Sequence, residues 1–190
     1  MNIFLMRHGQ PEVPRREDRI NSAGFPDCLK IYNSCGLSLH SKPEAHTLNK
    51  FKDFRAVVAS DFKRSIESAL RLSFPQPLIY VDPLFREVQD VFLRIPFLKL
   101  KPRTWSKVFI CLWYIGLFRY KASVREGRHR AKQCAKKLIE LAETHQSVLF
   151  VGHGFLNAYI ARELSAQGWK GPKMPSKRYW EYGAYQPEAS

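Results

Sequence analysis

Two histidines in this chain each stand at the end of a short apolar run and precede a glycine. The run "NIFLM" leads into Arg7 and His8, and the run "SVLFVG" leads into His153. Histidine offers a nitrogen that is uncharged near neutral pH and can act as a nucleophile. Arginine presents a planar fork that can hold two oxygens of one phosphate group. Together these residue types suit phosphoryl transfer, in which a protein mainly positions reactants and stabilises negative charge.

Strands and helices alternate along the chain and must position these residues. Short apolar segments at residues 2–6, 55–60, 77–81 and 147–154 are expected to form strands. Helices are expected from Asp61 to a point before Pro75, over 124–145 and over 155–166, and 178–186 is expected to add an edge strand. The alternation predicts an α/β fold, a three-layer sandwich with a mainly parallel central sheet flanked by helices.

The first of these helices shows an N-terminal signal and an apolar pattern. Ser60 or Asp61 is a suitable capping residue for it. Its apolar face should comprise Phe62, Ile66, Ala69 and Leu70.

The carboxyl ends of parallel strands lie at one edge of a sheet, where ligands collect. Arg7 and His8 follow the first expected strand, and His153 follows the fourth. Arg64 lies in the first turn of the helix after the second strand. The sequence therefore predicts a cationic site at this edge, although either histidine alone could be an ordinary loop or core residue.

Four segments, in order, resemble the histidine phosphatase (phosphoglycerate mutase-like) superfamily. "LMRHGQP" is similar to its RHG signature, and "VVASDFKRSIESA" to its second block, which selects Arg64. "PLFREV" is similar to the segment with the acidic residue, which selects Glu87, and "LFVGHG" to the block with the second histidine, His153. The resemblance covers roughly residues 1 to 90 and 121 to 165.

This resemblance implies roles for five residues. His8 would attack phosphorus and form a phosphohistidine, while Arg7, Arg64 and His153 would hold the phosphate oxygens. Glu87 would protonate the leaving alkoxide and then activate water, with Asp90 as the nearest substitute. The resemblance implies no metal and no cofactor.

Proline residues after the RHG signature favour hydrolysis over mutase activity. Mutase-like members carry Ser or Thr and Asn where this chain has Pro11 and Pro14. Proline offers neither a hydroxyl group nor a backbone donor. A phosphatase is therefore expected, with a phosphoglycerate mutase-like phosphotransferase and a non-catalytic member that binds phospholigands or membranes as the alternatives.

A segment at about 91–121 departs from the family pattern and is expected to be a helical insertion. Its uncharged run, Val108 to Phe118, spans about 16 Å as a helix, too short to cross a bilayer. Three interpretations stay open: a buried hairpin that caps the sheet, a lid with an apolar wall over the substrate, or a segment that touches anionic lipid. Trp113, Tyr114 and the basic flanks favour the last.

The chain has 190 residues and a formal net charge of +14, and it is expected to form a single domain over 1–190. The charge implies an anionic partner. A phosphorylated small-molecule substrate is expected, either a metabolite or a lipid-linked phosphate, with an anionic membrane surface as a possible second partner. The basic stretch 119–137 is interpreted as a solvated helix face, because no nucleic-acid-binding motif accompanies it. A cytoplasmic location is expected, because no secretory signal precedes Arg7.

The cysteines exclude another class of phosphatase. Cysteine phosphatases need Cys-x5-Arg, but Ser34, Ser41, Leu117 and Glu140 stand six residues after the four cysteines. No CxxC pair suggests a zinc site, so reduced and mostly buried thiols are expected. The sequence also lacks a P-loop motif.

Overall fold

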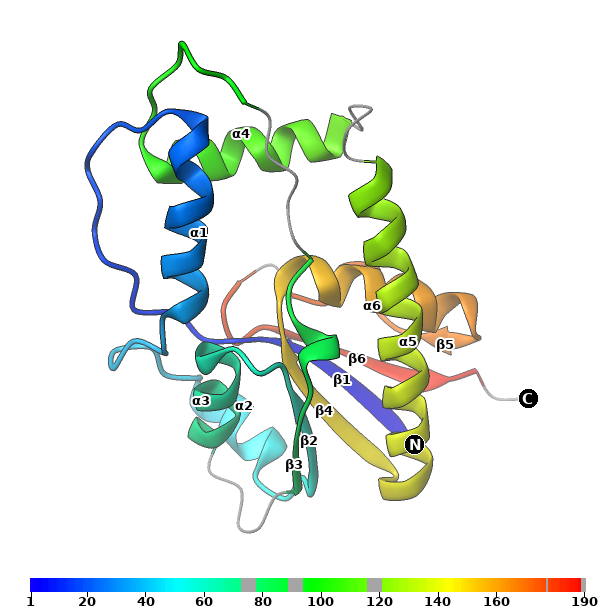
Figure 1. Ribbon diagram of the computed structural model, residues 1–190. Coiled ribbons are helices and arrows are strands. Elements are labelled where there is room, and N and C mark those ends of the chain that lie inside the picture. The colour runs from blue at the N-terminus through cyan, green and yellow to red at the C-terminus, as the bar shows by residue number, and fades with distance from the viewer. Residues whose placement is uncertain (73–77, 89–93, 116–120, 177, 189–190) are drawn as a thin grey trace.

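A computed structural model describes residues 1–72, 78–88, 94–115, 121–176 and 178–188 of the chain (Figure 1). Its centre is a six-stranded sheet with the strand order β3-β2-β4-β1-β6-β5. The strands are β1 (Asn2–Arg7), β2 (Ala56–Ala59), β3 (Leu78–Val81), β4 (Ser147–Gly152), β5 (Trp169–Lys170) and β6 (Tyr182–Pro187). The first four are mutually parallel, and β6 runs antiparallel to both β1 and β5.

Helices cover both faces of this sheet. They are α1 (Phe25–Ser34), α2 (Ala45–Phe51), α3 (Lys63–Arg71), α4 (Pro102–Ile115), α5 (Lys121–His145) and α6 (Gly154–Ala166), with short 3₁₀ turns η1 (Ser22–Gly24) and η2 (Pro83–Phe85). The predicted three-layer α/β sandwich with a mainly parallel sheet is confirmed. Helices α1 and α2 were not predicted.

Alternate side chains of the buried strands point into two separate cores, as the strand period requires. Ile3 and Leu5 of β1 pack with α5 and α6 on one face, whereas Phe4 and Met6 pack with α2 and α3 on the other. Strand β4 is buried along nearly all of its length. Both faces of the central strands are therefore buried. Because a shift of one residue would move every side chain to the other face, this burial fixes the register of β1 and β4 at the site.

Helix α3 begins later than predicted, and its buried face is different. Phe62 is the N-cap and provides no side-chain cap, so the prediction of Ser60 or Asp61 as the capping residue is wrong. Ser60 instead bonds His153, and Asp61 pairs with Arg86. Leu70, predicted to be inward, is 59% exposed. The buried face of α3 comprises Arg64, Ser65, Ser68 and Ala69, because this helix faces a polar site.

Two smaller predictions are also wrong. The C-terminal strand β6 is not at the edge of the sheet, because it lies between β1 and β5. All four cysteines are free as expected, but only Cys134 is buried, while Cys111 is exposed on α4. Edge position and cysteine burial both depend on packing partners distant in the sequence.

The described part of the insertion, residues 94–115, consists of a loop and the helix α4, which packs on α1 rather than on the sheet (Figure 1). Trp105 stacks on Phe109 with ring centroids 5.3 Å apart, and Phe109 contacts Phe25 of α1 at 5.2 Å. The indole N–H of Trp105 donates to the carbonyl of Ile20 at 2.8 Å. Helix α4 therefore packs on α1, and because the segment that joins α4 to α5 lies outside the described residues, the interpretation of a buried hairpin that caps the sheet stays a prediction.

The membrane interpretation falls partly outside the described structure. The side chains of Trp113 and Tyr114, on which it rested, lie outside the described residues. Among the helices of the described ranges, none has the length and hydrophobicity to cross a bilayer.

Candidate active site

The carboxyl ends of β1 and β4 place the two predicted histidines side by side. Arg7 is in register with Gly152, so His8 and His153 are the next residues on two neighbouring strands. The backbone N–H of His8 donates to the carbonyl of Gly152 at 2.9 Å. The two imidazole rings lie 5.1 Å apart, centroid to centroid. Parallel pairing thus converts two distant sequence motifs into one site.

The hydrogen bonds of His8 fix its tautomer. Its Nδ1 lies 2.6 Å from the carbonyl oxygen of Gly9, which can only accept, so Nδ1 carries the proton. Its Nε2 lies 3.2 Å from Nε of Arg64, which can only donate. The lone pair of a neutral imidazole is therefore on Nε2, the atom beside the arginine.

Burial and nearby positive charge keep both rings neutral. His8 is 2% exposed, and burial, followed by the charge of Arg64, lowers its pKa to about 3. The pKa of His153, which is 1% exposed, is also lowered well below 6.5, first by burial and then by His8 and Arg64. Both side chains are therefore uncharged near neutral pH.

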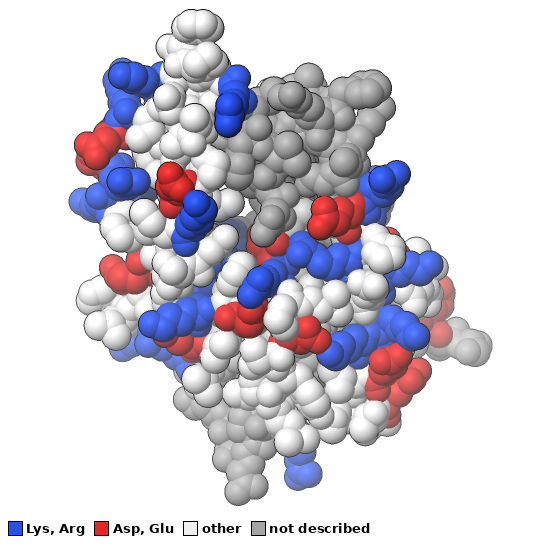
Figure 2. All heavy atoms as spheres, in the orientation of Figure 1, with Lys and Arg blue, Asp and Glu red and all other residues white. Residues whose placement is uncertain are grey.

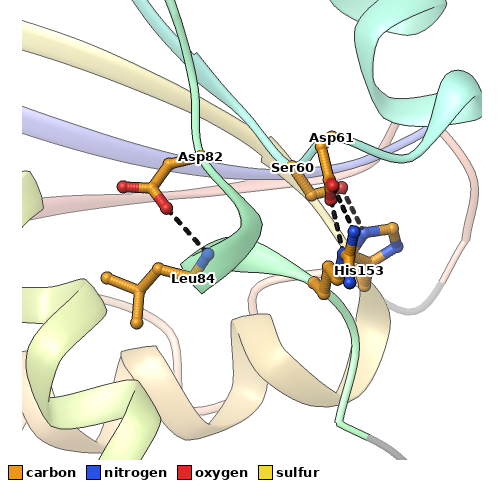
Figure 3. Close-up of polar contacts among 6 residues, drawn as sticks. Ser60, Asp61, Asp82, Leu84 and His153 are labelled. Carbon is orange, nitrogen blue, oxygen red and sulfur yellow. Dashed lines mark hydrogen bonds and ion pairs between the residues drawn. The ribbon is translucent and has the colours of Figure 1, made fainter.

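His153 is held by a serine that sequence reasoning considered only as a helix cap. Oγ of Ser60 lies 2.7 Å from Nε2 of His153 (Figure 3). Ser60 follows β2, which pairs with β4, so both residues leave the sheet at the same edge. Nδ1 of His153 is buried and has no hydrogen-bond partner among the described residues. A bound anion could occupy that position.

Arg64 reaches the site from the first turn of α3. It is 1% exposed, and burial lowers its pKa without removing its charge. Besides His8, its guanidinium donates to the carbonyl of Tyr32 and to Oδ1 of Asn33, each at 3.2 Å. It also lies over the Tyr32 ring, 4.5 Å from the centroid. Arg64 therefore links the sheet edge to the end of α1.

Arg7 contacts an aromatic residue from the C-terminal segment. Its guanidinium carbon lies 4.6 Å from the ring centroid of Tyr179. The same ring lies 5.7 Å from His8. We predicted no chemistry for the segment 178–186, so Tyr179 was missed.

The side chain of Glu87 lies beside the N-terminus of α6, the helix that begins directly after His153. Its carboxylate accepts from the backbone N–H groups of Leu156 at 2.9 Å, Phe155 at 3.3 Å and Val88 at 3.0 Å. Burial raises the pKa of this carboxyl, while the three backbone bonds oppose that rise. The guanidinium of Arg130 in α5 donates a hydrogen bond to the backbone carbonyl of Glu87 at 3.0 Å. Asp90, the predicted substitute, lies outside the described residues.

One cavity of about 480 Å³ joins these groups. Its lining includes all five residues that the sequence selected, namely Arg7, His8, Arg64, Glu87 and His153. It also includes Tyr32 and Asn33 of α1, for which the sequence offers no motif. In the described ranges, no three His, Cys, Asp or Glu side chains gather as metal ligands.

Comparison with known proteins gives structural but no sequence matches. No family model and no curated protein matches the chain. The structure of the protein histidine phosphatase SixA complexed with tungstate is similar with a TM-score of 0.57 and 15% identity, over 99% of this chain and 89% of that chain. A mycobacterial glucosyl-3-phosphoglycerate phosphatase is similar with a TM-score of 0.56 and 16% identity, over 96% and 88%.

A third structure extends the likeness to an animal protein. The ecdysone phosphate phosphatase from Bombix mori in complex with tungstate is similar with a TM-score of 0.55 and 14% identity, over 96% of this chain and 88% of that chain. At these identities the likeness concerns the fold.

Proposed function

We propose that this chain, which has the fold of the histidine phosphatases, hydrolyses phosphate monoesters through a phosphohistidine on His8. The observation that carries the proposal is the neutral His8 ring with its lone pair on Nε2, facing Arg64 in a cavity shared with Arg7, Glu87 and His153. Two of the similar structures are tungstate complexes, and tungstate is a tetrahedral oxyanion like phosphate. The phosphatase names of these neighbours support the same reaction class.

In the first step, Nε2 of His8 attacks phosphorus while the bond from phosphorus to the ester oxygen breaks. The contact between Arg64 and Nε2 opens as the phosphate enters, and the guanidinium then holds phosphate oxygens. Glu87 gives its proton to the leaving alkoxide, which its raised pKa favours. The products of this step are an alcohol and a phosphohistidine.

In the second step, ionised Glu87 takes a proton from water. The water oxygen bonds to phosphorus, and the bond from phosphorus to Nε2 breaks. Inorganic phosphate leaves, and His8 and protonated Glu87 are restored. Arg7 and Arg64 stabilise negative charge in both steps, and the unpartnered Nδ1 of His153 donates to a phosphate oxygen when Nε2 accepts from Ser60.

The test is release of phosphate from p-nitrophenyl phosphate in the presence of a chelator. We expect His8→Ala to lose at least a thousandfold in kcat, since the covalent route needs this atom. His129→Ala, at an exposed histidine of α5, is the matched control and should keep full activity.

Failure of the wild type to hydrolyse the ester, or full activity of His8→Ala, would contradict the proposal. Transfer of the phosphate to a second hydroxyl group in place of water would identify the mutase alternative. Binding of inorganic phosphate without turnover would identify the non-catalytic alternative.

A second proposal concerns the membrane surface and rests on the tip of the molecule farthest from the sheet. The loop that leads into α4 projects there (Figure 1). Phe97 is 98% exposed and Leu98 43% exposed. An isolated β-bridge between Ile20 and Leu100 places the loop that precedes η1 beside the loop that leads into α4. The exposed basic residues of the two loops are Arg15, Arg16, Arg19, Arg94, Lys99 and Lys101, and they outnumber the exposed acidic residues Glu12, Glu17 and Asp18.

We propose that this tip contacts anionic lipid, because apolar side chains surrounded by cations favour that interface. Flotation with vesicles of phosphatidylglycerol and phosphatidylcholine tests it, and Phe97→Ser should reduce binding severalfold. Leu39→Ser, at a residue that is 77% exposed elsewhere, is the control. Absence of binding at low salt would rule the contact out.

A further inference from the structure

The cavity is larger than a phosphate group requires, and much of its wall is apolar. Its volume of about 480 Å³ lies in the range of sites that enclose a whole small molecule. Its charged lining residues are Arg7 of β1, Arg64 of α3, Glu87 after η2 and the exposed Arg162 of α6. The apolar lining comes mainly from α1, α4 and α6 and comprises Phe25, Leu29, Phe62, Val88, Ile110, Phe155, Ala158 and Met174.

The wall formed by α1 and α4 is fixed in place before any ligand binds. Ile110 of α4 lines the cavity, and the preceding residue, Phe109, is 1% exposed in the contact with α1. Trp105, one turn earlier, is fully buried and hydrogen-bonded to Ile20. The wall therefore presents a preformed apolar surface.

Several polar side chains of this lining already have partners within the protein. Oγ of Ser106 donates to the carbonyl of Pro102 at 3.2 Å, and Oγ of Ser176 accepts from Asn157 at 3.1 Å. Oδ1 of Asn33 accepts from Arg64. Arg162 also lines the cavity but is exposed to solvent. Along the buried part of this wall, a leaving group rich in hydroxyl groups would lose water and find few protein groups to replace it.

We propose that the substrate is the phosphate monoester of a bulky apolar alcohol, whose leaving group packs against α1, α4 and α6. This inference rests on the proposed function, because it takes the phosphate to lie beside His8. Ile110, Leu29 and Phe155 then determine specificity by contact with the leaving group.

The experiment measures calorimetric binding of methyl-, butyl-, hexyl- and octylphosphonate, which cannot be hydrolysed. We expect affinity to rise about fourfold for each buried methylene group until the cavity is filled. Hexylphosphonate should also bind more tightly than glucose 6-phosphate, whose leaving group is polar. An affinity independent of chain length, or a preference for the sugar phosphate, would overturn the inference.

A variant of the apolar wall gives a second measurement. Ile110→Thr should lower the ratio of octylphosphonate to methylphosphonate affinity about fivefold, because a hydroxyl group replaces buried hydrocarbon. Cys111→Thr, at the adjacent exposed position, should leave that ratio unchanged. An unchanged ratio in Ile110→Thr with a normal melting temperature would contradict the assigned wall.

Hydrolysis of the matching alkyl phosphates separates this inference from the proposed function. Rising phosphonate affinity without hydrolysis of any alkyl phosphate would remove the proposed function and keep the apolar site. Hydrolysis of short esters, together with a phosphonate affinity that does not change with chain length, would keep the proposed function and remove the apolar site.

Discussion

At the scale of residues, the site depends on hydrogen bonds that leave one nitrogen of each histidine for the ligand. His8 uses Nδ1 for the Gly9 carbonyl, and His153 uses Nε2 for Ser60. Ser60 is itself fixed, because its backbone N–H donates to Oγ of Ser65 at 3.1 Å. Oγ of Ser65 in turn donates to the carbonyl of Val151 in β4. The orientation of His153 is thus tied to the sheet that carries it.

Removal of the serine hydroxyl tests this positioning role. Ser60→Ala leaves Nε2 of His153 without its partner, and we expect kcat to fall about tenfold with a small change in KM. The kcat pH profile should also shift, which a purely structural defect would not cause. Ser34→Ala, at an exposed serine, is the control. Unchanged kcat in Ser60→Ala would show that the bond is dispensable.

The two buried histidines also predict how stability depends on pH. Their folded-state pKa values lie below the ordinary 6.5, so the unfolded chain binds more protons when the pH falls below 6.5. The stability that the neutral rings confer is complete above pH 6.5 and is lost as the pH falls. We expect each ring to reduce the unfolding free energy by about 1.4 kcal/mol per pH unit between pH 6 and 5.

Urea denaturation at several pH values measures this slope. Glu87, whose pKa is raised, contributes with the opposite sign, so the comparison must be made between variants. His8→Asn should have a smaller slope than the wild type, whereas His129→Asn, at an exposed histidine, should match it. Equal slopes in all three proteins would contradict the buried neutral state of His8.

At the scale of elements, helix α6 obtains its N-terminal cap from another part of the chain. The side chain of its N-cap residue, His153, makes no capping bond, and the Glu87 carboxylate accepts from the N–H groups of Phe155 and Leu156 instead. Glu87 itself follows η2, where the Asp82 carboxylate accepts from the N–H of Leu84 at 2.8 Å (Figure 3). The proposed acid therefore also stabilises the helix that follows the second histidine.

Two substitutions of Glu87 separate these roles. Glu87→Gln keeps an oxygen for the bonds from Leu156 and Val88 but cannot transfer a proton, so we expect near-normal stability and at least a hundredfold lower kcat. Glu87→Ala should also lose about 1–2 kcal/mol of unfolding free energy, because the helix N–H groups lose their acceptor. Urea denaturation and phosphate release measure the two effects. Equal stability of both variants would contradict the capping role.

At the scale of the whole molecule, positive charge is distributed over the surface. The net charge of +14 has no single focus on the visible face, where Lys and Arg side chains alternate with Asp and Glu (Figure 2). On α5 the exposed cations include Arg125, Arg128, Lys132 and Lys136. This distribution produces a general positive field that attracts anions. Among the described residues of this face, it does not form a stripe of cations along which a nucleic acid would bind.

Such a field predicts salt-sensitive capture of an anionic substrate. We expect kcat/KM for a dianionic ester to fall about fivefold between 10 and 200 mM sodium chloride, since the Debye length shortens over that range. The kcat value should change little, because the buried groups at His8 are weakly screened. A kcat/KM value independent of salt would contradict electrostatic capture.

The sequence by itself determined the sheet core and the convergence of the site. Apolar runs can be recognised locally, and parallel strands place their carboxyl ends at one edge, so His8 and His153 were expected at the same edge. The motif order then selected Arg64 and Glu87 without knowledge of the fold. The placement of the two histidines needs only local pattern and one general rule of α/β architecture, whereas Glu87 was selected by the resemblance to the histidine phosphatase superfamily.

Only the tertiary structure decided which distant segments complete the site. Tyr179, Ser60 and the apolar wall of α4 reach the site through packing between segments far apart in the chain, which no local pattern encodes. The inner position of β6 likewise depends on its pairing with β1. Local propensity indicates whether a segment forms a helix or a strand. The apolar surface that other segments of the chain provide determines where that element packs.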